Sequence, residues 1–174
     1  MGLREQILAE HSKAQTNRII RWVGRSQARM DELVRLFLAG EYRVTQRAGW
    51  PLSYCAQKNP ELIRKHIPKL IRNLKTPGLH DAVKRNTVRL LQDIPVPVRS
   101  QGELMNICFE YLASPDETVA VKVFAMTILE KLSRIYPDIR QELKWIIEER
   151  WDYETAAFHA RGRKILKQLN QPFN

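Results

Sequence analysis

Apolar positions recur along this chain at a step of 37 to 38 residues, and each copy has the spacing of two helices. The first helix of the pair is repeated in Arg47–Leu52, Arg85–Leu90 and Val123–Ile128, and one residue early in Ala160–Ile165. The second is repeated in Ile67, Leu70 and Ile71, in Met105, Cys108 and Phe109, and in Leu143, Ile146 and Ile147. Apolar residues three and four apart share one side of a helix. Because one helix pair cannot bury its apolar face alone, the pattern predicts stacked helical repeats.

Turn-forming residues divide the predicted helices at regular places. Asn59-Pro60 and Tyr136-Pro137 lie between paired helices, where proline suits the first helical position. No segment has a strand pattern, so we predict an all-α, right-handed α-α superhelix of about four helix hairpins. We expect a single domain over 1–174, with capping helices in 1–40, repeats in 41–75, 79–113 and 116–151, and a capping helix in 153–169.

The composition is that of an ordinary globular chain, with 44% hydrophobic and 28% charged residues among 174. No apolar run approaches the roughly 20 residues of a membrane helix, and the first residues lack the apolar core of a secretory signal. We therefore expect a cytoplasmic protein that does not enter a membrane, and a monomer.

Cysteine and histidine do not form a recognisable metal motif in this sequence. Cys55 and Cys108 are 53 positions apart, each on the apolar side of a predicted helix, so we interpret both as buried thiols. The four histidines lack the H-E-x-x-H or Cys/His spacing of a zinc site. We therefore predict no metal, no catalytic site and no small-molecule cofactor.

Positive charge is concentrated in the first part of the chain. The formal net charge is +10, and residues 1–75 carry 15 Lys and Arg against 6 Asp and Glu, whereas residues 76–174 carry 14 against 13. A clustered positive field attracts polyanions, while a dispersed one mainly favours solubility. The asymmetry therefore predicts an anionic partner at the N-terminal half.

A first candidate set lies on a helix predicted over residues 17–38. One arc of this helix is apolar and contains Ile19, Val23, Met30, Leu33, Val34 and Phe37. Another arc carries the candidate set: Arg18, Arg21, Trp22, Arg25 and Arg29. Arginine binds phosphate oxygens in a bidentate manner and an indole can stack on a base, which suits a nucleic-acid backbone. The alternative is a solvated face whose arginine stems cover apolar surface.

A second candidate set lies on a helix predicted over residues 60–75. Its basic side carries the anion-binding candidates Arg64, Lys65, Lys69 and Arg72. In helical solenoids the second helix of each pair usually lines the concave surface, so this side can face a groove. Pro68 removes a helical hydrogen bond, and residues 60–67 can therefore form a separate turn.

The period, the Asn59–Leu62 junction, Pro51 inside a first helix and the Tyr136-Pro137 junction resemble HEAT repeats over residues 41–169. HEAT repeats form an armadillo-type α-α superhelix, and the resemblance implies a protein-binding scaffold. One HEAT-like branch consists of DNA glycosylases that remove alkylated purines. For that chemistry only Asp152 with Trp145 and Trp151 can be nominated; alternatively, Trp151 packs under the next helix and Asp152 caps it.

Three hypotheses follow for the function. We favour a non-catalytic HEAT-like binding module or scaffold that recognises a protein or a polyanionic partner through its basic N-terminal half. The alternative is a nucleic-acid-binding protein, with a DNA alkylation-repair glycosylase as its enzymatic form. These hypotheses differ in the salt dependence of binding and in the release of a modified base.

Overall fold

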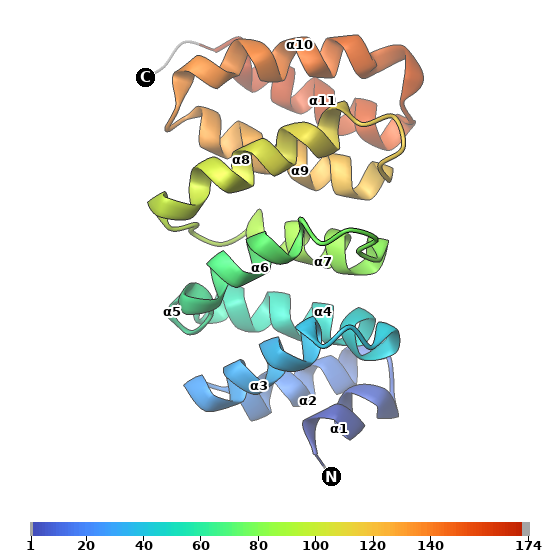
Figure 1. Ribbon diagram of the computed structural model, residues 1–174, viewed down its shortest axis with the longest axis vertical. Coiled ribbons are helices and arrows are strands. Elements are labelled where there is room, and N and C mark those ends of the chain that lie inside the picture. The colour runs from blue at the N-terminus through green and yellow to red at the C-terminus, as the bar shows by residue number, and fades with distance from the viewer. Residues whose placement is uncertain (1, 172–174) are drawn as a thin grey trace. The chain divides into compact units, whose positions relative to one another are not determined.

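The computed structural model describes residues 2–171, and all of its regular elements are helices (Figure 1). The longer elements are α1 (Leu3–Ala9), α2 (Lys13–Val23), α3 (Gln27–Leu38), α4 (Tyr42–Lys58), α5 (Pro60–Ile63), α6 (Ile67–Asn73), α7 (Asp81–Leu91), α8 (Val98–Ala113), α9 (Val119–Ser133), α10 (Arg140–Arg150) and α11 (Ala156–Leu169). Three short 3-10 helices are η1 (Arg64–His66), η2 (Pro137–Ile139) and η3 (Trp151–Tyr153). The prediction of an all-α fold is confirmed.

The chain divides into two compact units, unit 1 (Met1–Ser100) and unit 2 (Gln101–Asn174). In unit 1, α4 is the central helix, because α1, α2, α3 and α7 all pack against it. Its apolar side, with Val44, Ala48 and Leu52, is fully buried. Burial of this stripe removes apolar surface from water and is the main stabilising contribution to a helix pair.

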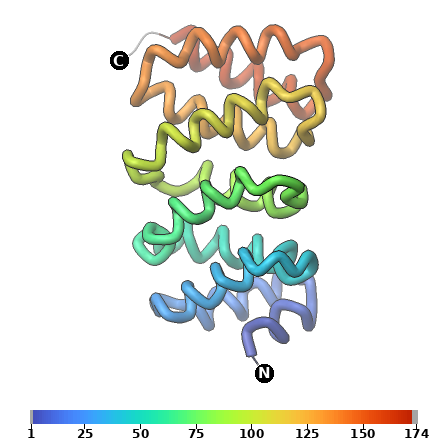
Figure 2. The backbone as a smooth tube through the Cα atoms, in the orientation of Figure 1, coloured from blue at the N-terminus to red at the C-terminus, as the bar shows by residue number. Residues whose placement is uncertain are grey.

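Consecutive hairpins of unit 1 are joined by side-chain hydrogen bonds at a separation of 35 residues. The backbone tube in Figure 2 follows α2 through a short turn into α3, and α4 is followed in the same way by α5 and α6. Asn59 Nδ2 donates to the carbonyl of Gly24 at 3.0 Å, and Gln27 Nε2 donates to the carbonyl of Leu62 at 2.9 Å. Equivalent positions of neighbouring hairpins therefore lie side by side, as a repeat fold requires.

Prolines occupy the helix positions that the sequence pattern predicted for them. Pro60 opens α5 and Pro137 opens η2, each at the start of the second helix of a pair. Pro51 lies inside α4 and is buried. At the first helical position a missing N–H has no intrahelical partner to lose, so proline begins these helices without cost.

Unit 2 is built on α9, which packs against both α10 and α11. Most of α9 is buried, including the charged Lys122 and Glu130. Tyr136 donates through its hydroxyl to Gln101 Oε1 at 2.7 Å, again 35 residues apart. The division of the chain into repeats and capping helices stays a prediction.

Candidate anion-binding surface

The first candidate set lies on two helices and not on one. α2 ends at Val23, Gly24 adopts a φ of 51°, and the Ser26 hydroxyl accepts from the Arg29 amide at the start of α3. The positive φ suits glycine, which lacks a Cβ, and serine is a favoured N-cap. The prediction of a continuous helix over 17–38 is therefore wrong. The apolar residues that the sequence assigned to this helix are nevertheless all buried, now on α2 and α3.

Within this set, two arginines have contacts inside the chain. Arg29 donates from Nη1 to the Trp22 carbonyl at 2.6 Å, and its guanidinium carbon lies 5.0 Å from the centroid of the Trp22 ring. This cation–π contact connects the end of α2 to the start of α3. Arg18 donates from Nη1 to Gln15 Oε1 at 2.8 Å. The structure therefore divides the stripe into α2, a turn and α3.

The other two arginines of the set face solvent. Arg21, in the last turn of α2, and Arg25, in the turn, are both exposed. Within residues 2–171, neither has a hydrogen-bond or ion-pair partner. Their full positive charge is thus available to a ligand.

The second candidate set spans three short elements. α5 ends at Ile63, Arg64–His66 form η1, and Pro68 lies in the first turn of α6. The structure therefore has the separate turn that the sequence left open as the consequence of Pro68. Ile63, Ile67 and Leu70 are still fully buried, because the helical path continues through the 3-10 turn.

Lys65 and His66 of this region bind one carboxylate on α3. Lys65 Nζ lies 2.7 Å from Asp31 Oδ2, and His66 Nε2 lies 2.6 Å from Asp31 Oδ1, which also accepts from Gln27 at 2.7 Å. Hydrogen bonding from Lys65, with smaller contributions from Gln27 and His66, lowers the pKa of Asp31 to about 2. Asp31 therefore stays ionised and neutralises Lys65, which makes Lys65 a poor ligand for an external anion.

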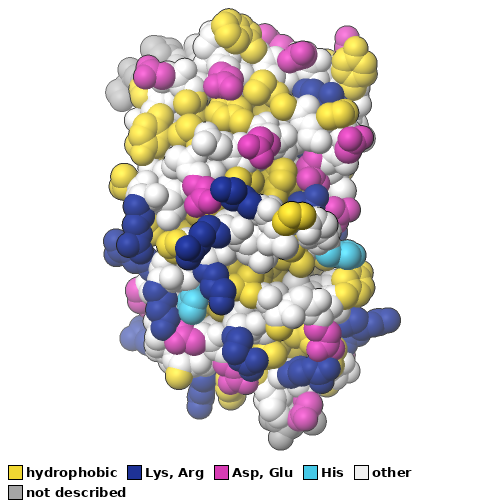
Figure 3. Space-filling view, viewed as in Figure 1, with side chains coloured by type: hydrophobic (Ala, Val, Ile, Leu, Met, Phe, Trp, Pro, Cys, Tyr) yellow, Lys and Arg dark blue, Asp and Glu magenta, His cyan; other side chains and the backbone are white. Residues whose placement is uncertain are grey.

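The remaining cations of the second set are exposed. Arg72 donates from Nε to the Pro68 carbonyl at 3.3 Å, within its own helix. Arg64 and Lys69 have no partner in the part of the chain that the structure describes. In Figure 3, Lys and Arg side chains gather over α5 and α6. This face of unit 1 therefore presents several cations without countercharges.

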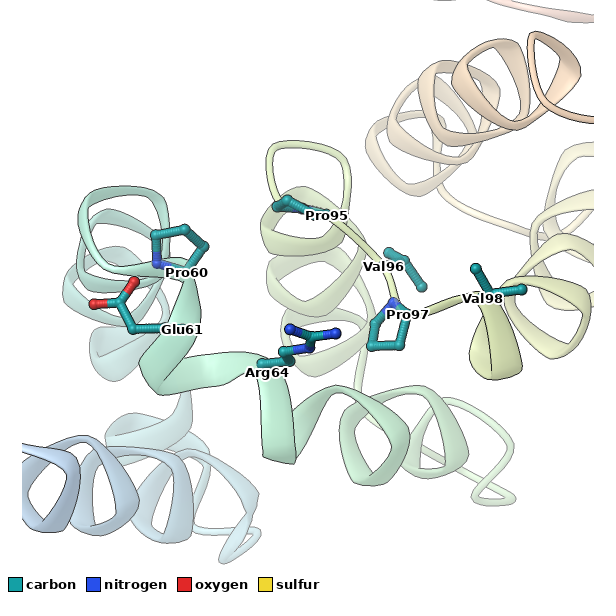
Figure 4. Close-up of a pocket in the computed structure, with 7 residues that line it drawn as sticks. All are labelled: Pro60, Glu61, Arg64, Pro95, Val96, Pro97 and Val98. Atoms are coloured by element: carbon teal, nitrogen blue, oxygen red, sulfur yellow. The ribbon is translucent and has the colours of Figure 1, made fainter.

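Arg64 also lines a cleft of about 420 Å³ in unit 1. The cleft lies between the Pro60–Glu61 turn and the segment Pro95–Val98, and Figure 4 shows the Arg64 side chain extending into the space between them. Pro95, Val96, Pro97 and Val98 make the opposite wall apolar. The cleft thus combines the Arg64 guanidinium and the Glu61 carboxylate with an apolar wall, which suits a partly apolar ligand whose acidic group contacts Arg64 and avoids Glu61.

The sequence reasoning missed Asp31, although one signal could have identified it. Asp31 precedes Lys65 by 34 residues, close to the repeat step, and equivalent positions in adjacent hairpins meet in a repeat fold. A cation and a carboxylate at such a separation can therefore be expected to pair. Charge counting alone cannot show this, because it ignores which cations have partners.

Of the grouping Asp152, Trp145 and Trp151, the Trp145 ring is exposed, whereas the Trp151 ring packs inside the fold. Trp151 stacks on His159 with ring centroids 4.5 Å apart, and a Cβ at Gly162 would lie 2.9 Å from its ring, so Trp151 packs against α11. This is the packing alternative that the sequence offered. The expected cap is wrong: α11 begins at Ala156 after Thr155, and Asp152 lies in η3.

Metal and thiol chemistry find no support in the described residues. No group of three His, Cys, Asp or Glu in residues 2–171 could hold a metal ion. Cys55 and Cys108 are free and buried. Burial raises the pKa of both thiols, to about 12 for Cys55. Both are therefore protonated and unreactive at neutral pH. No helix in residues 2–171 is long and apolar enough to cross a membrane.

Stacked helix hairpins and an exposed, partly unpaired polar surface define a helical repeat protein that acts as a scaffold or binding module. A family model described as HEAT repeat domain matches residues 3–169, and the chain belongs to that family. The predicted resemblance and fold class are thereby confirmed. No curated protein and no solved structure matches the chain significantly.

Proposed function

We propose that this HEAT repeat protein is a non-catalytic binding module that recognises an anionic partner through unit 1. The observation that supports this proposal is a group of exposed cations without acidic partners in residues 2–171: Arg21, Arg25, Arg64 and Lys69. Unit 1 carries 19 Lys and Arg against 8 Asp and Glu, whereas unit 2 carries 10 against 11. A field of this kind steers anions toward unit 1.

The first candidate for the partner is an acidic segment of another protein. The cleft beside Arg64 supports it, because Pro95, Val96 and Val98 offer apolar contacts next to an unpaired guanidinium. An acidic segment that also carries apolar residues can use both features, and its affinity decreases only moderately with salt.

The second candidate is a nucleic acid, and the contact between Trp22 and Arg29 favours it. The indole is half-buried and lies beside Arg21 and Arg25, so a base could stack near cations that hold the phosphates. A partner held through phosphates releases counterions, and its affinity decreases steeply with salt. The cytoplasmic location and the monomeric state stay predictions.

Three charge-reversal variants test the proposal, each lowering the formal net charge equally. The first is Arg21→Glu with Arg25→Glu, and the second is Arg64→Glu with Lys69→Glu. The control is Arg163→Glu with Lys167→Glu on α11, where both cations are exposed and without partners in the described chain. We would measure binding to an acidic peptide of alternating Glu and Leu, and to single- and double-stranded DNA, at several salt concentrations.

The proposal requires that the first or the second variant lose affinity while the control and the helical circular dichroism stay unchanged. For DNA, loss of two phosphate contacts should reduce the salt slope by about 1.5. Equal losses in all three variants would mean that only net charge matters and would contradict a specific surface. Selective loss of peptide binding favours the protein partner, and selective loss of DNA binding favours the nucleic acid.

A further inference from the structure

Unit 1 has a second polar concavity between α4 and α7, and no residue of it belongs to either candidate set. Its volume is about 230 Å³, and it is lined by His11, Gln46, Trp50, Arg85, Asn86 and Arg89. Five of these side chains are exposed or half-buried polar or aromatic groups, and only Asn86 is buried in the contact between α4 and α7. The concavity therefore requires its own explanation.

The close approach of two helices forms the floor of this concavity. A Cβ at Gly49 of α4 would lie 2.5 Å from Cγ of Asn86 on α7, so only glycine lets the Asn86 amide rest against α4. Gln46 and Trp50 are one turn apart on α4, and Arg85 and Arg89 are one turn apart on α7. The two helices thus present their polar groups to the same space.

These polar side chains are not satisfied within the chain. In residues 2–171, the side chains of Gln46, Arg85, Asn86 and Arg89 make no hydrogen bond. Asn86 is only 7% exposed as a residue, but its amide atoms are not among the fully buried unpaired atoms of residues 2–171, so they are open to the concavity. These accessible amide and guanidinium groups are therefore free to form hydrogen bonds with a ligand in the concavity.

The charge and the aromatic ring of the concavity restrict the ligand class. Trp50 is 38% exposed; the guanidinium carbon of Arg89 lies 5.9 Å from the centroid of its ring, and the His11 ring lies 5.9 Å away at 65°. The two acidic residues of this region have other contacts. Asp81 pairs with Lys84 at 3.3 Å, and Asp93 accepts from Gln57 at 3.0 Å. Neither guanidinium therefore forms an ion pair in residues 2–171, although Asp81 and Asp93 lie four residues from Arg85 and Arg89 in the sequence.

We propose that this concavity binds a nucleotide unit. Arg85 and Arg89 hold the phosphate, since two guanidinium groups match its oxygens in geometry and charge. Trp50 stacks on the base, and the carboxamides of Gln46 and Asn86 donate to and accept from the base edge. The space is smaller than the roughly 300 Å³ at which pockets for whole drug-sized ligands begin, so one base edge and one phosphate fit it. The proposal is independent of the anionic partner proposed above.

Isothermal titration calorimetry with four probes tests the site on the full chain. The probes are AMP, adenosine, inorganic phosphate, and a single-stranded hexamer of dA without a terminal phosphate. The variants are Arg85→Gln with Arg89→Gln, Trp50→Leu, and Trp50→Phe, which keeps a stacking face. Matched controls in unit 2 are Arg163→Gln with Lys167→Gln, and Trp145→Leu at an exposed tryptophan. Circular dichroism verifies that each variant is folded.

We expect AMP or the hexamer to bind the wild type with a dissociation constant of about 1 mM or lower. The double arginine variant should lose at least about tenfold, and Trp50→Leu about five- to tenfold, with recovery in Trp50→Phe. Tighter binding of the hexamer than of AMP would assign the nucleotide to a strand, and the reverse would assign it to a free nucleotide.

Three results would overturn the nucleotide assignment. They are no saturable binding of AMP or of the hexamer, equal binding of inorganic phosphate and AMP with no effect of Trp50→Leu, or equal losses in the control variants. The charge-reversal variants at Arg21, Arg25, Arg64 and Lys69 should leave AMP binding unchanged, so failure of one proposal can be distinguished from failure of the other.

Discussion

The two units of this protein use their cations in different ways. In unit 2, Lys122 and Arg150 bind Glu154, and Arg134 binds Glu130. Arg161 donates to the Thr127 hydroxyl at 2.6 Å. In unit 1, several arginines and a lysine stay exposed without partners in residues 2–171. The same residue types thus stabilise the fold at the buried ion pairs of unit 2 and remain available to a ligand on the surface of unit 1, although unit 2 also has exposed cations without partners in the described chain, such as Arg163 and Lys167.

This difference shows why formal charge is an incomplete guide to binding. A cation that is paired inside the fold contributes to stability and adds little field outside, whereas an unpaired one retains its full attraction for anions. Lys65 illustrates the point within unit 1, because Asp31 neutralises it although its neighbours Arg64 and Lys69 are free in the described chain. The ion pairs in the structure therefore distinguish cations that stabilise the fold from cations that can attract a ligand.

The largest expected effect is at Glu154, the acceptor for two cations of unit 2. Glu154 Oε1 lies 2.5 Å from Lys122 Nζ, and the two side chains are 6% and 2% exposed. Glu154→Leu leaves a buried ammonium without its carboxylate and should lower the free energy of unfolding by about 3–5 kcal/mol. Urea denaturation measures this loss.

The double variant Lys122→Met with Glu154→Leu is the control for that experiment. It removes both charges of the buried pair and should recover a large part of the lost stability, while the half-buried Arg150 still loses its acceptor. A loss below about 1 kcal/mol in Glu154→Leu alone would show that water reaches Lys122, and the contrast between the units would then be much weaker.

An intermediate effect is expected when a methyl group is added at the close helix contacts. Gly162→Ala in unit 2 places a Cβ 2.9 Å from the Trp151 ring and should cost about 1–3 kcal/mol. Gly49→Ala in unit 1 should cost less, because the shorter Asn86 side chain can rotate into the concavity. Thermal unfolding measures both, and Gly102→Ala, with no atom near the added Cβ, should be neutral or stabilising by up to about 1 kcal/mol. Equal losses at all three glycines would contradict the steric explanation.

The smallest effect concerns Asp31 and acid. Its pKa is lowered from 3.8 to about 2, so its contribution to stability is fully present above pH 3.8 and is lost as the pH falls toward 2. Since the carboxylate is 37% exposed, screening limits this contribution to about 1 kcal/mol or less. Asp31→Asn should remove that part of the acid-induced loss, which urea midpoints between pH 5 and pH 2 would reveal. A parallel pH dependence in the variant would refute the assignment.

Much of the fold could be predicted from the sequence, because apolar spacing and proline position are local signals. The break at Gly24–Ser26 was missed for a physical reason. A three-residue turn leaves Val23 and Met30 on the same side of the hairpin, so the apolar pattern continues through it. A glycine after one helix and a serine before the next were the available signals.

The site was less predictable than the fold, because it depends on contacts between helices. Exposure of Arg21 and Arg64 follows from helical periodicity, but the pairing of Lys65 with Asp31 does not. The concavity at Trp50 depends on Gly49. The need for glycine at this position is visible only once α7 is known to pack against α4. Such features can be found from sequence only after the repeat step has been used to align neighbouring hairpins.

Each unit contains one buried thiol, Cys55 on α4 and Cys108 on α8. A maleimide cannot reach either sulfur until the surrounding helices separate, and the raised pKa slows the reaction further. The alkylation rate of each cysteine therefore measures how often the helices around it open. The order in which they are alkylated reports which half of the molecule loosens first.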